Sequence, residues 1–182
     1  MIRPWELLGT RLLADHGIFR VREDYSLSPR TGKPHRLYVM ESRDWVNVVP
    51  VTAEGRVVCV RQFRHGVRSV AIEVPGGIVD PRETPEEAAR RELFEETGYA
   101  GEDIVRIGTM NPNPAIQNNR CHIFLATGVQ REMSQSLDQG EDIEVILINE
   151  HDIPGLIADG TIDNGIMVAA FHYFHLHRVG PS

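Results

Sequence analysis

The chain has 182 residues, of which 41% are hydrophobic and 25% charged, a composition typical of a soluble globular protein with a sizeable core. Its length favours one domain, or one domain with a small appendage. The 19 basic and 26 acidic residues give a formal net charge of −7, so the chain lacks the basic footprint of a nonspecific nucleic-acid binder. No signal peptide and no apolar run long enough to span a membrane is visible. We therefore expect a cytoplasmic protein with neither nucleic acid nor membrane as a partner.

Residues 1–44 are predicted to form a small N-terminal β extension. Leu7–Leu13 and Gly17–Tyr25 alternate partly between apolar and polar residues, and His35–Glu41 has the pattern of a returning strand. Ser26–Pro34 lies between them and is rich in turn residues.

From residue 45 to residue 182 the pattern becomes that of a mixed α/β core. Strands are predicted over Val46–Thr52, Gly55–Phe63, Val70–Val74, Glu102–Met110, Cys121–Thr127 and Ile143–Ile148. Helices are predicted over Ala88–Thr97, His151–Ala158 and Asn164–His177. A Pro/Asn-rich loop is expected at Asn111–Asn119, and a polar, mobile loop at Arg131–Gly140. This order of elements predicts a mixed sheet flanked by helices.

The most specific segment of the sequence runs from Gly77 to Tyr99 and reads GIVDPRETPEEAARRELFEETGY. Within it, Thr84-Pro85-Glu86-Glu87 has the form of a capping box, which marks the start of a helix. The helix-forming residues that follow end at Gly98, a residue type that commonly terminates helices. The segment therefore predicts a loop followed by one well-defined helix.

Glutamates gather on one face of this predicted helix. Glu92 and Glu96 are one turn apart, and Glu95 is three residues from Glu92. Such carboxylates repel one another unless a cation lies among them, and hard oxygen donors suit Mg²⁺ or Mn²⁺. Arg91 can pair with Glu95 one turn away. For an isolated run of glutamates, a solvated acidic helix face would be the commoner interpretation.

The fixed residues of this segment follow the pattern G-x5-E-x7-R-E-U-x-E-E-x-G-U, where U is a bulky apolar residue. This pattern resembles the Nudix box, the signature of hydrolases that cut the pyrophosphate bond of a nucleoside diphosphate linked to another group. Every fixed position is filled, with Tyr99 as a mild departure at the last, and so many matches at fixed spacing are far rarer by chance than a short motif. The resemblance implies a Nudix α/β/α sandwich with a mixed sheet over residues 45–182.

Other segments resemble the ADP-ribose pyrophosphatase and nucleoside-diphosphate-sugar hydrolase branch of that family. They follow in the branch's order: Asp44–Val49, Arg61–Arg64, Glu73–Gly77, Pro114, Glu141–Val145 and Gly160–Asn164. The resemblance implies Mg²⁺-dependent hydrolysis of a nucleoside diphosphate sugar, with ADP-ribose, cut to AMP and ribose 5-phosphate, as the leading candidate. It also implies a homodimer in which residues 1–44 contribute to dimerisation and to the base pocket.

The resemblance assigns metal-binding and catalytic roles to particular residues. The metal ligands would be the Gly76 carbonyl and the carboxylates of Glu92, Glu95, Glu96 and Glu141. Glu83 and Arg91 would hold the helix ligands in place, Glu95 would take part in catalysis beside them, and Glu141 would position and deprotonate the attacking water. The branch often has a second acidic residue just before Glu141, where this chain has Asp138-Gln139-Gly140, so the identity of the base stays open.

Substrate contacts are implied in the same way. Arg64 would bind the phosphates and Glu73 would lie beside the substrate, while Asn113, Pro114 and Asn119 would line the terminal-sugar side. Asn119 stands where related enzymes often have glutamate, so the sugar preference can differ. Trp45 is a candidate for stacking on the base, with core or dimer packing as the alternative.

The sequence is compatible with three functions. The first is the nucleoside-diphosphate-sugar hydrolase, and the second is a Nudix hydrolase of dinucleoside polyphosphates or GDP-mannose. The third is a non-catalytic nucleotide-sugar sensor of the same fold, which would be expected to have an eroded box. The intact box favours an enzyme.

Overall fold

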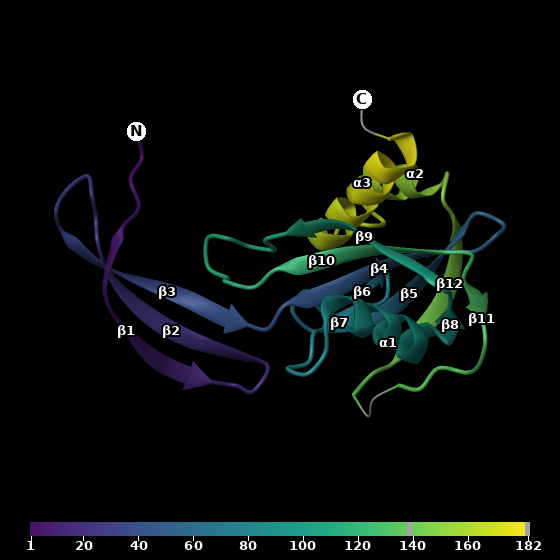
Figure 1. Cartoon of the computed structure of the whole chain (residues 1–182), viewed down its shortest axis with the longest axis horizontal. Coiled ribbons are helices and arrows are strands. Elements are labelled where there is room, and N and C mark those ends of the chain that lie inside the picture. Colours follow the sequence, from purple (N-terminus) through teal and green to yellow (C-terminus); the bar gives the residue numbers. More distant parts are fainter. Residues whose placement is uncertain (138–139, 181–182) are drawn as a thin grey trace. The chain divides into compact units, whose positions relative to one another are not determined.

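The computed structural model describes residues 1–137 and 140–180 and shows two compact units. One unit comprises Met1–Arg43 with Asn111–Arg120, and the other comprises Asp44–Met110 with Cys121–Ser182. Figure 1 shows the elements of both. No helix in the described residues is long and apolar enough to cross a membrane.

The first unit is built on a three-stranded antiparallel sheet in the order β1-β2-β3. The strands are β1 (Glu6–Asp15), β2 (Phe19–Leu27) and β3 (Pro34–Ser42). The segment Asn111–Arg120 joins this unit because the Met40 N–H donates to the Ile116 carbonyl at 2.7 Å and the Ser42 N–H to Asn118 Oδ1 at 3.2 Å. The three strands predicted from alternation are confirmed, with small shifts at their ends.

A seven-stranded mixed sheet forms the centre of the second unit, in the order β12-β5-β4-β10-β9, with β6 paired to β5 and β7 to β4. The strands are β4 (Trp45–Val51), β5 (Arg56–Arg64), β6 (Ser69–Glu73), β7 (Gly76–Ile78), β9 (Asp103–Met110), β10 (Cys121–Thr127) and β12 (Ile143–Asn149). β4 and β10 are parallel, whereas the other pairs are antiparallel. A separate two-stranded ladder joins β8 (Tyr99–Ala100) to β11 (Gln130–Arg131).

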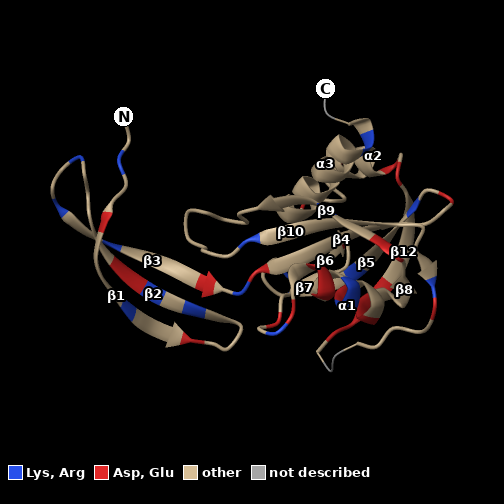
Figure 2. Cartoon of the chain, viewed as in Figure 1, with Lys and Arg blue, Asp and Glu red and all other residues tan. Residues whose placement is uncertain are grey.

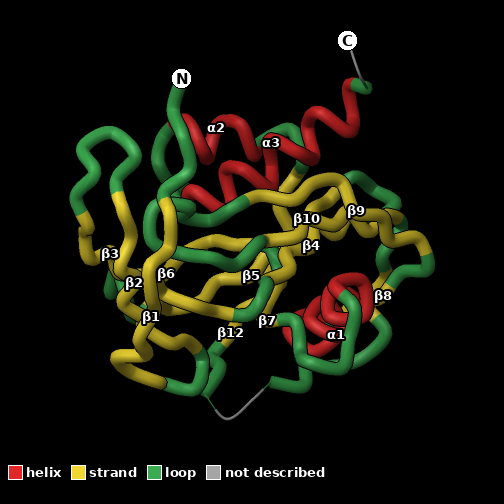
Figure 3. Tube along the Cα trace, turned by 60° about the vertical axis from the view of Figure 1, so that its left-hand side comes forward, coloured by secondary structure: helices red, strands yellow, loops and turns green. Residues whose placement is uncertain are grey.

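Helices cover both faces of this sheet (Figure 3): α1 (Pro85–Thr97) on one side, α2 (Ile153–Ala158) and α3 (Gly165–Val179) on the other. Side chains alternate along a strand, so β10 contributes to two cores. Its residues Cys121, Ile123 and Leu125 join the core under α2 and α3, while Phe124 and Ala126 join the core under α1. The predicted α/β/α sandwich is confirmed.

Three short strands, β7, β8 and β11, were not predicted, because two or three residues are too few to show a period. A mobile loop is predicted at Arg131–Gly140, but Arg131 itself is the last residue of β11. The segment is also tied to α1: the Gln135 side-chain amide donates to the Glu96 carbonyl at 2.6 Å, and the Ser136 N–H to the Glu95 carbonyl at 2.8 Å. Polar composition alone does not reveal such contacts.

Candidate active site

Helix α1 has the termini that its sequence predicts. The Thr84 hydroxyl accepts from the Glu87 N–H at 3.3 Å, and the Glu87 carboxylate accepts from the Thr84 N–H at 2.7 Å. Gly98 closes the helix in the left-handed conformation at φ 72°, which glycine adopts without steric cost. Ala89 and Leu93 are buried in the core under α1. The helix is therefore fixed in rotation, with its glutamates on a defined side.

Arg91 connects the acidic residues of this site. It donates to Glu83 through Nε at 3.1 Å and Nη2 at 2.6 Å, and through Nη1 to Glu92 at 2.8 Å and Glu95 at 3.1 Å. It also donates to the Ile78 carbonyl at 3.1 Å. The hydrogen bonds to Glu83, above all, raise the pKa of Arg91 despite its partial burial. Figure 2 shows this mixture of acidic and basic residues on α1.

The predicted pair of Arg91 with Glu95 is confirmed, but the bonds of Arg91 to Glu83 and Glu92 were not predicted from helix spacing. Glu83 precedes the helix, and only the turn of the loop brings its carboxylate back to Arg91. In the sequence, a role for Glu83 beside the helix was indicated only by its fixed position in the box.

Two carboxylates of α1 are held away from water. Glu96 is 4% exposed and accepts a hydrogen bond from the Gly76 N–H at 3.0 Å. Burial raises the pKa of Glu96 to about 8, and the charges of Glu92 and Glu141 act in the same direction. Burial also raises the pKa of Glu92, against the opposing effect of Arg91. The site therefore gathers carboxyl groups where their ionised forms are poorly solvated.

The glycines of β7 allow the backbone to approach these carboxylates. A Cβ on Gly77 would lie 2.1 Å from Glu92 Oε1, and a Cβ on Gly76 would lie 2.2 Å from the Val46 carbonyl oxygen. Any other residue at these positions would have to displace its neighbours, so this part of the box is explained by close approach.

The donor set fits a hard divalent cation. The gathered groups are carboxylate oxygens, the ligands that Mg²⁺ and Mn²⁺ prefer, and a cation would relieve the raised pKa values of Glu92 and Glu96. Within residues 1–137 and 140–180, no three acidic, histidine or cysteine side chains already form a metal cage. Glu92 accepts from Arg91 through Oε1, and a carboxylate has further lone pairs that could bind a cation. Asp138, a candidate for the base, lies outside the described residues.

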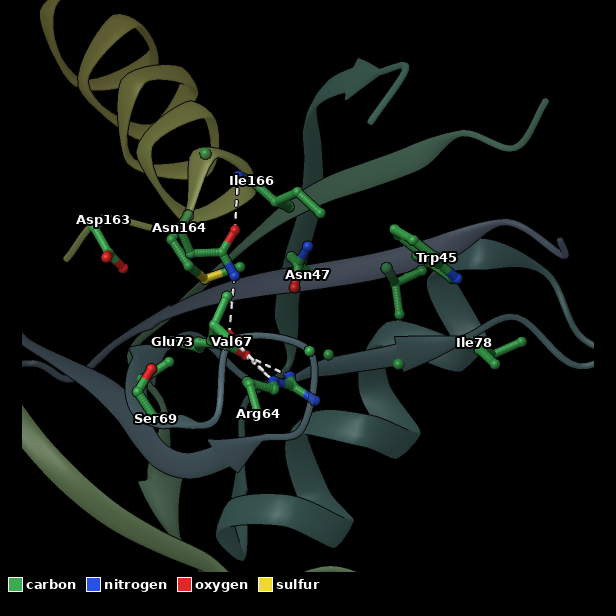
Figure 4. A pocket seen from close by; sticks show the side chains of 17 residues that line it. Trp45, Asn47, Arg64, Val67, Ser69, Glu73, Ile78, Asp163, Asn164 and Ile166 are labelled. Carbon is green, nitrogen blue, oxygen red and sulfur yellow. Dashed lines mark hydrogen bonds and ion pairs between the residues drawn. The ribbon is translucent and has the colours of Figure 1, made fainter. Parts of the chain in front are cut away.

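A cavity of about 680 Å³ is lined by residues of β4, β5, β6, β7 and the start of α3 (Figure 4). This volume is within the range of small-molecule sites. Its lining includes Trp45, Asn47 and Ile78, the tip of the β5–β6 hairpin, and the first turn of α3. Gly76 and Gly77 also line it, and the same two glycines touch the carboxylates of α1. The cavity and the acidic helix therefore belong to one site.

Arg64 and Glu73 both line the cavity, and their contact with substrate stays a prediction. Arg64 donates through Nε to both oxygens of Glu73, at 3.0 and 3.2 Å, and through Nη2 to Glu73 Oε2. Burial opposes the charge of Arg64, but its bonds to Glu73 outweigh this effect and raise the pKa of Arg64. Asn164 donates to the same carboxylate at 2.9 Å. The sequence predicts Asn164 as the start of a helix but does not predict its contact with Glu73.

Three other predicted substrate residues, Asn113, Pro114 and Asn119, belong to the first unit. Asn119 is buried, and neither Oδ1 nor Nδ2 of its amide has a hydrogen-bond partner within the part of the chain that the structure describes. A buried amide without partners is costly unless a ligand or water satisfies it. The contact of these residues with a sugar stays a prediction.

Comparison with known proteins places this site in a family. The NUDIX domain family model matches residues 41–171. The chain is 30% identical to an ADP-ribose pyrophosphatase of Bacillus subtilis (strain 168) over 80% of this chain and 79% of that protein. It is 28% identical to a GDP-mannose pyrophosphatase of Pectobacterium atrosepticum over 91% of each.

A solved structure described as an ADP compounds hydrolase has the same fold, with a TM-score of 0.87 and 21% identity over 99% of this chain and 98% of that one. The match of the family model, the complete box and the observed contacts of Arg91 agree with one another. The chain therefore belongs to the NUDIX domain family, and the prediction of a Nudix pyrophosphohydrolase is confirmed.

Proposed function

We propose that the protein hydrolyses the pyrophosphate bond of nucleoside diphosphate sugars in a Mg²⁺-dependent reaction, with ADP-ribose as the leading substrate. The observation that carries this proposal is the shared position of Gly76 and Gly77, which border both the cavity and the carboxylates of α1. A diphosphate seated in the cavity would lie between Arg64 and these carboxylates. The names of the relatives from Bacillus subtilis and Pectobacterium atrosepticum support a nucleoside-diphosphate-linked substrate.

The residues of this chain have distinct tasks in the proposed reaction. Arg64 binds phosphate oxygens, for which a planar guanidinium is well suited. Glu92, Glu96, Glu95 and Glu141, with the Gly76 carbonyl, would hold the divalent cation. When bound, the cation neutralises charge on the phosphoryl oxygens and makes water more acidic. Glu83 keeps Arg91, and through it Glu92 and Glu95, in place.

Hydrolysis proceeds by attack of water on one phosphorus atom. The new phosphorus–oxygen bond forms as the bridging phosphorus–oxygen bond breaks, and the second phosphate leaves with the bridging oxygen. Glu141 is the proposed acceptor of the water proton. The charge of Glu141 acts on both Glu92 and Glu96, which supports its place near the reacting groups.

The rest of the cavity suits the nucleoside part of such a substrate. Trp45, Ile78 and Ile166 provide apolar walls, and an aromatic ring can stack on any base. Separately, the proposed contacts for the terminal sugar are Asn113, Pro114 and Asn119, whose side-chain amide has no hydrogen-bond partner among the described residues. An amide in place of a carboxylate changes the hydrogen bonds offered to sugar hydroxyls, so it would tune the choice among sugars.

We also propose a homodimer formed through residues 1–44, which would also contribute to the base pocket. The support is the number of exposed apolar side chains on β1 and β3: Leu7, Leu8, Leu12, Leu13, Leu37 and Tyr38. Exposed apolar groups in this density are typical of an interaction surface, and a two-fold dimer is the commonest homo-oligomer.

A substrate panel tests the proposal. ADP-ribose, ADP-glucose, GDP-mannose, a diadenosine polyphosphate and a nucleoside triphosphate are incubated with Mg²⁺ or with EDTA. Metal-dependent release of a nucleoside monophosphate, fastest from ADP-ribose, is expected. Preference for GDP-mannose would move the protein toward the activity named for the Pectobacterium relative, and turnover of polyphosphates alone would contradict the sugar specificity. Binding without any turnover would favour the sensor.

A further inference from the structure

In the cavity, the ion pair between half-exposed Arg64 and buried Glu73 has a third member, Asn164, from the start of α3. Glu73, the last residue of β6, is 2% exposed and accepts from Nε and Nη2 of Arg64. Asn164 Nδ2 donates to Glu73 Oε1 at 2.9 Å. Figure 4 shows the three side chains in line, from the start of α3 to the guanidinium.

The amide of Asn164 is engaged at both ends. Its Oδ1 accepts from the Ile166 N–H at 2.9 Å and so caps α3, while its Nδ2 faces Glu73. Serine and aspartate cap helices about as well as asparagine. Neither supplies a donor here, because the serine side chain is shorter and the aspartate side chain is ionised and accepts only. The cap therefore does not explain asparagine at this position, whereas the contact with Glu73 does.

Glu73 determines the orientation of the Arg64 guanidinium and which of its N–H groups remain available to a ligand. Nε and Nη2 of Arg64 are both used by Glu73, while Nη1 has no hydrogen bond to any described residue. The Nδ2 group of Asn164 is a third donor to Glu73 and limits rotation of the carboxylate. Because Arg64 makes a bidentate ion pair with this carboxylate, the plane of the carboxylate sets the plane of the guanidinium.

We propose that Asn164 is a positioning residue that, through Glu73, orients Arg64 so that Nη1 meets the phosphates of the substrate. This inference rests on the proposed function, because it takes Arg64 as the phosphate ligand. It predicts that Asn164 affects substrate binding only while Arg64 is present. A residue that merely capped α3 would act independently of Arg64.

The test uses Asn164→Ser, which keeps a capping hydroxyl but cannot reach Glu73, and Asn164→Asp, which keeps the cap and the size but faces Glu73 with a negative charge. We expect the KM for ADP-ribose to rise about 10-fold in Asn164→Ser, because a hydrogen bond to a charged group is lost, and to rise further in Asn164→Asp. The value of kcat should stay within about twofold, since Arg64 contacts phosphate before and during the reaction.

A matched control is available in Asn149→Ser. Asn149 Oδ1 accepts from the His151 N–H at 3.0 Å, two residues along the chain, as Asn164 does from Ile166. Asn149 lies at the end of β12, outside the cavity lining described above, and no hydrogen bond to a carboxylate is recorded for it within the described residues. This control should leave KM unchanged, and thermal unfolding should show both Asn→Ser variants folded.

The decisive step is a double-mutant cycle with Arg64→Ala. In that background, Asn164→Ser should change KM by about twofold or less, because coupled residues are not additive. In the Asn164→Ser single variant, the Kd for ADP-ribose in EDTA, measured by titration calorimetry, should rise by the same factor as KM. An equal effect of Asn164→Ser in both backgrounds, or an unchanged KM, would overturn the inference. If the wild-type protein neither bound nor hydrolysed ADP-ribose, ADP-glucose or GDP-mannose, the proposed function itself would fail, and with it the role of Arg64.

Discussion

At the scale of single residues, the site depends on how closely β7 approaches Glu92. Gly77→Ala would place a Cβ 2.1 Å from Glu92 Oε1. The clash is with the end of a flexible side chain, so the protein should fold while the carboxylate is displaced. We expect the concentration of Mg²⁺ needed for half-maximal hydrolysis to rise about 10-fold or more, the effect typical of disturbing the surroundings of a metal ligand.

The control for this prediction is Gly155→Ala in α2, where nothing lies within 4 Å of the added Cβ. It should leave the Mg²⁺ dependence unchanged. An unaltered Mg²⁺ dependence in Gly77→Ala would mean that the position of Glu92 is not critical for cation binding.

The raised pKa of Glu96 predicts a pH dependence of stability for the metal-free protein. Its pKa is about 8 in the folded protein and ordinarily 4.5. Between these values the folded state retains a proton that the unfolded state has lost. Proton binding by Glu96 stabilises the folded state fully below pH 4.5, and this stabilisation is lost as pH rises towards about 8. Over this range, the free energy of unfolding should fall by at most ~1.4 kcal/mol per pH unit because of Glu96.

Urea denaturation in EDTA at several pH values measures this slope. Glu96→Gln cannot titrate, so its free energy of unfolding should fall less steeply over the same range. Parallel curves for the two proteins would show that Glu96 does not hold a proton in the folded state.

At the scale of elements, α1 owes part of its stability to the capping box. Thr84→Ala removes the acceptor for the Glu87 N–H and should cost about 1 kcal/mol, which lowers Tm by about 2–4 °C in a protein of this size. Thr84→Ser keeps the hydroxyl and should unfold close to the wild-type temperature in a calorimetric scan. Equal Tm values for all three proteins would contradict this role of the box.

Sequence reasoning succeeded for elements with a repeating pattern or with explicit end signals. Helix α1 has both, since Thr84, Pro85 and Gly98 mark its ends and Ala89 and Leu93 face the core. Strand β10 shows a nearly continuous apolar run because both of its faces are covered by helices.

Contacts between residues far apart in sequence could not be predicted in this way. Asn164 and Glu73 are 91 residues apart, and only the folded sheet brings the start of α3 to the end of β6. The sequence around Asn164 indicated a helix N-terminus, which accounts for its Oδ1 but not for its Nδ2.

At the scale of the whole molecule, the dimer proposal has a direct test. Light scattering should give twice the 20.5 kDa mass of the chain. Leu12→Asp replaces a 55% exposed leucine of β1 and should shift the mass towards the monomer, because burying a carboxylate in an apolar interface is costly. The matched control is Leu176→Asp on α3, where leucine is 48% exposed. A monomeric wild-type protein would contradict the proposed dimer.

Whether the carboxylates of α1 hold a catalytic cation is decided by AMP release from ADP-ribose, measured for wild-type protein and Glu96→Gln with Mg²⁺ or with EDTA. We expect AMP and ribose 5-phosphate from the wild type with Mg²⁺ only, and a rate at least about 100-fold lower in Glu96→Gln, since a preorganised charge-stabilising group is lost. Comparable hydrolysis by Glu96→Gln, or by the wild type in EDTA, would contradict a cation-dependent reaction at the carboxylates of α1.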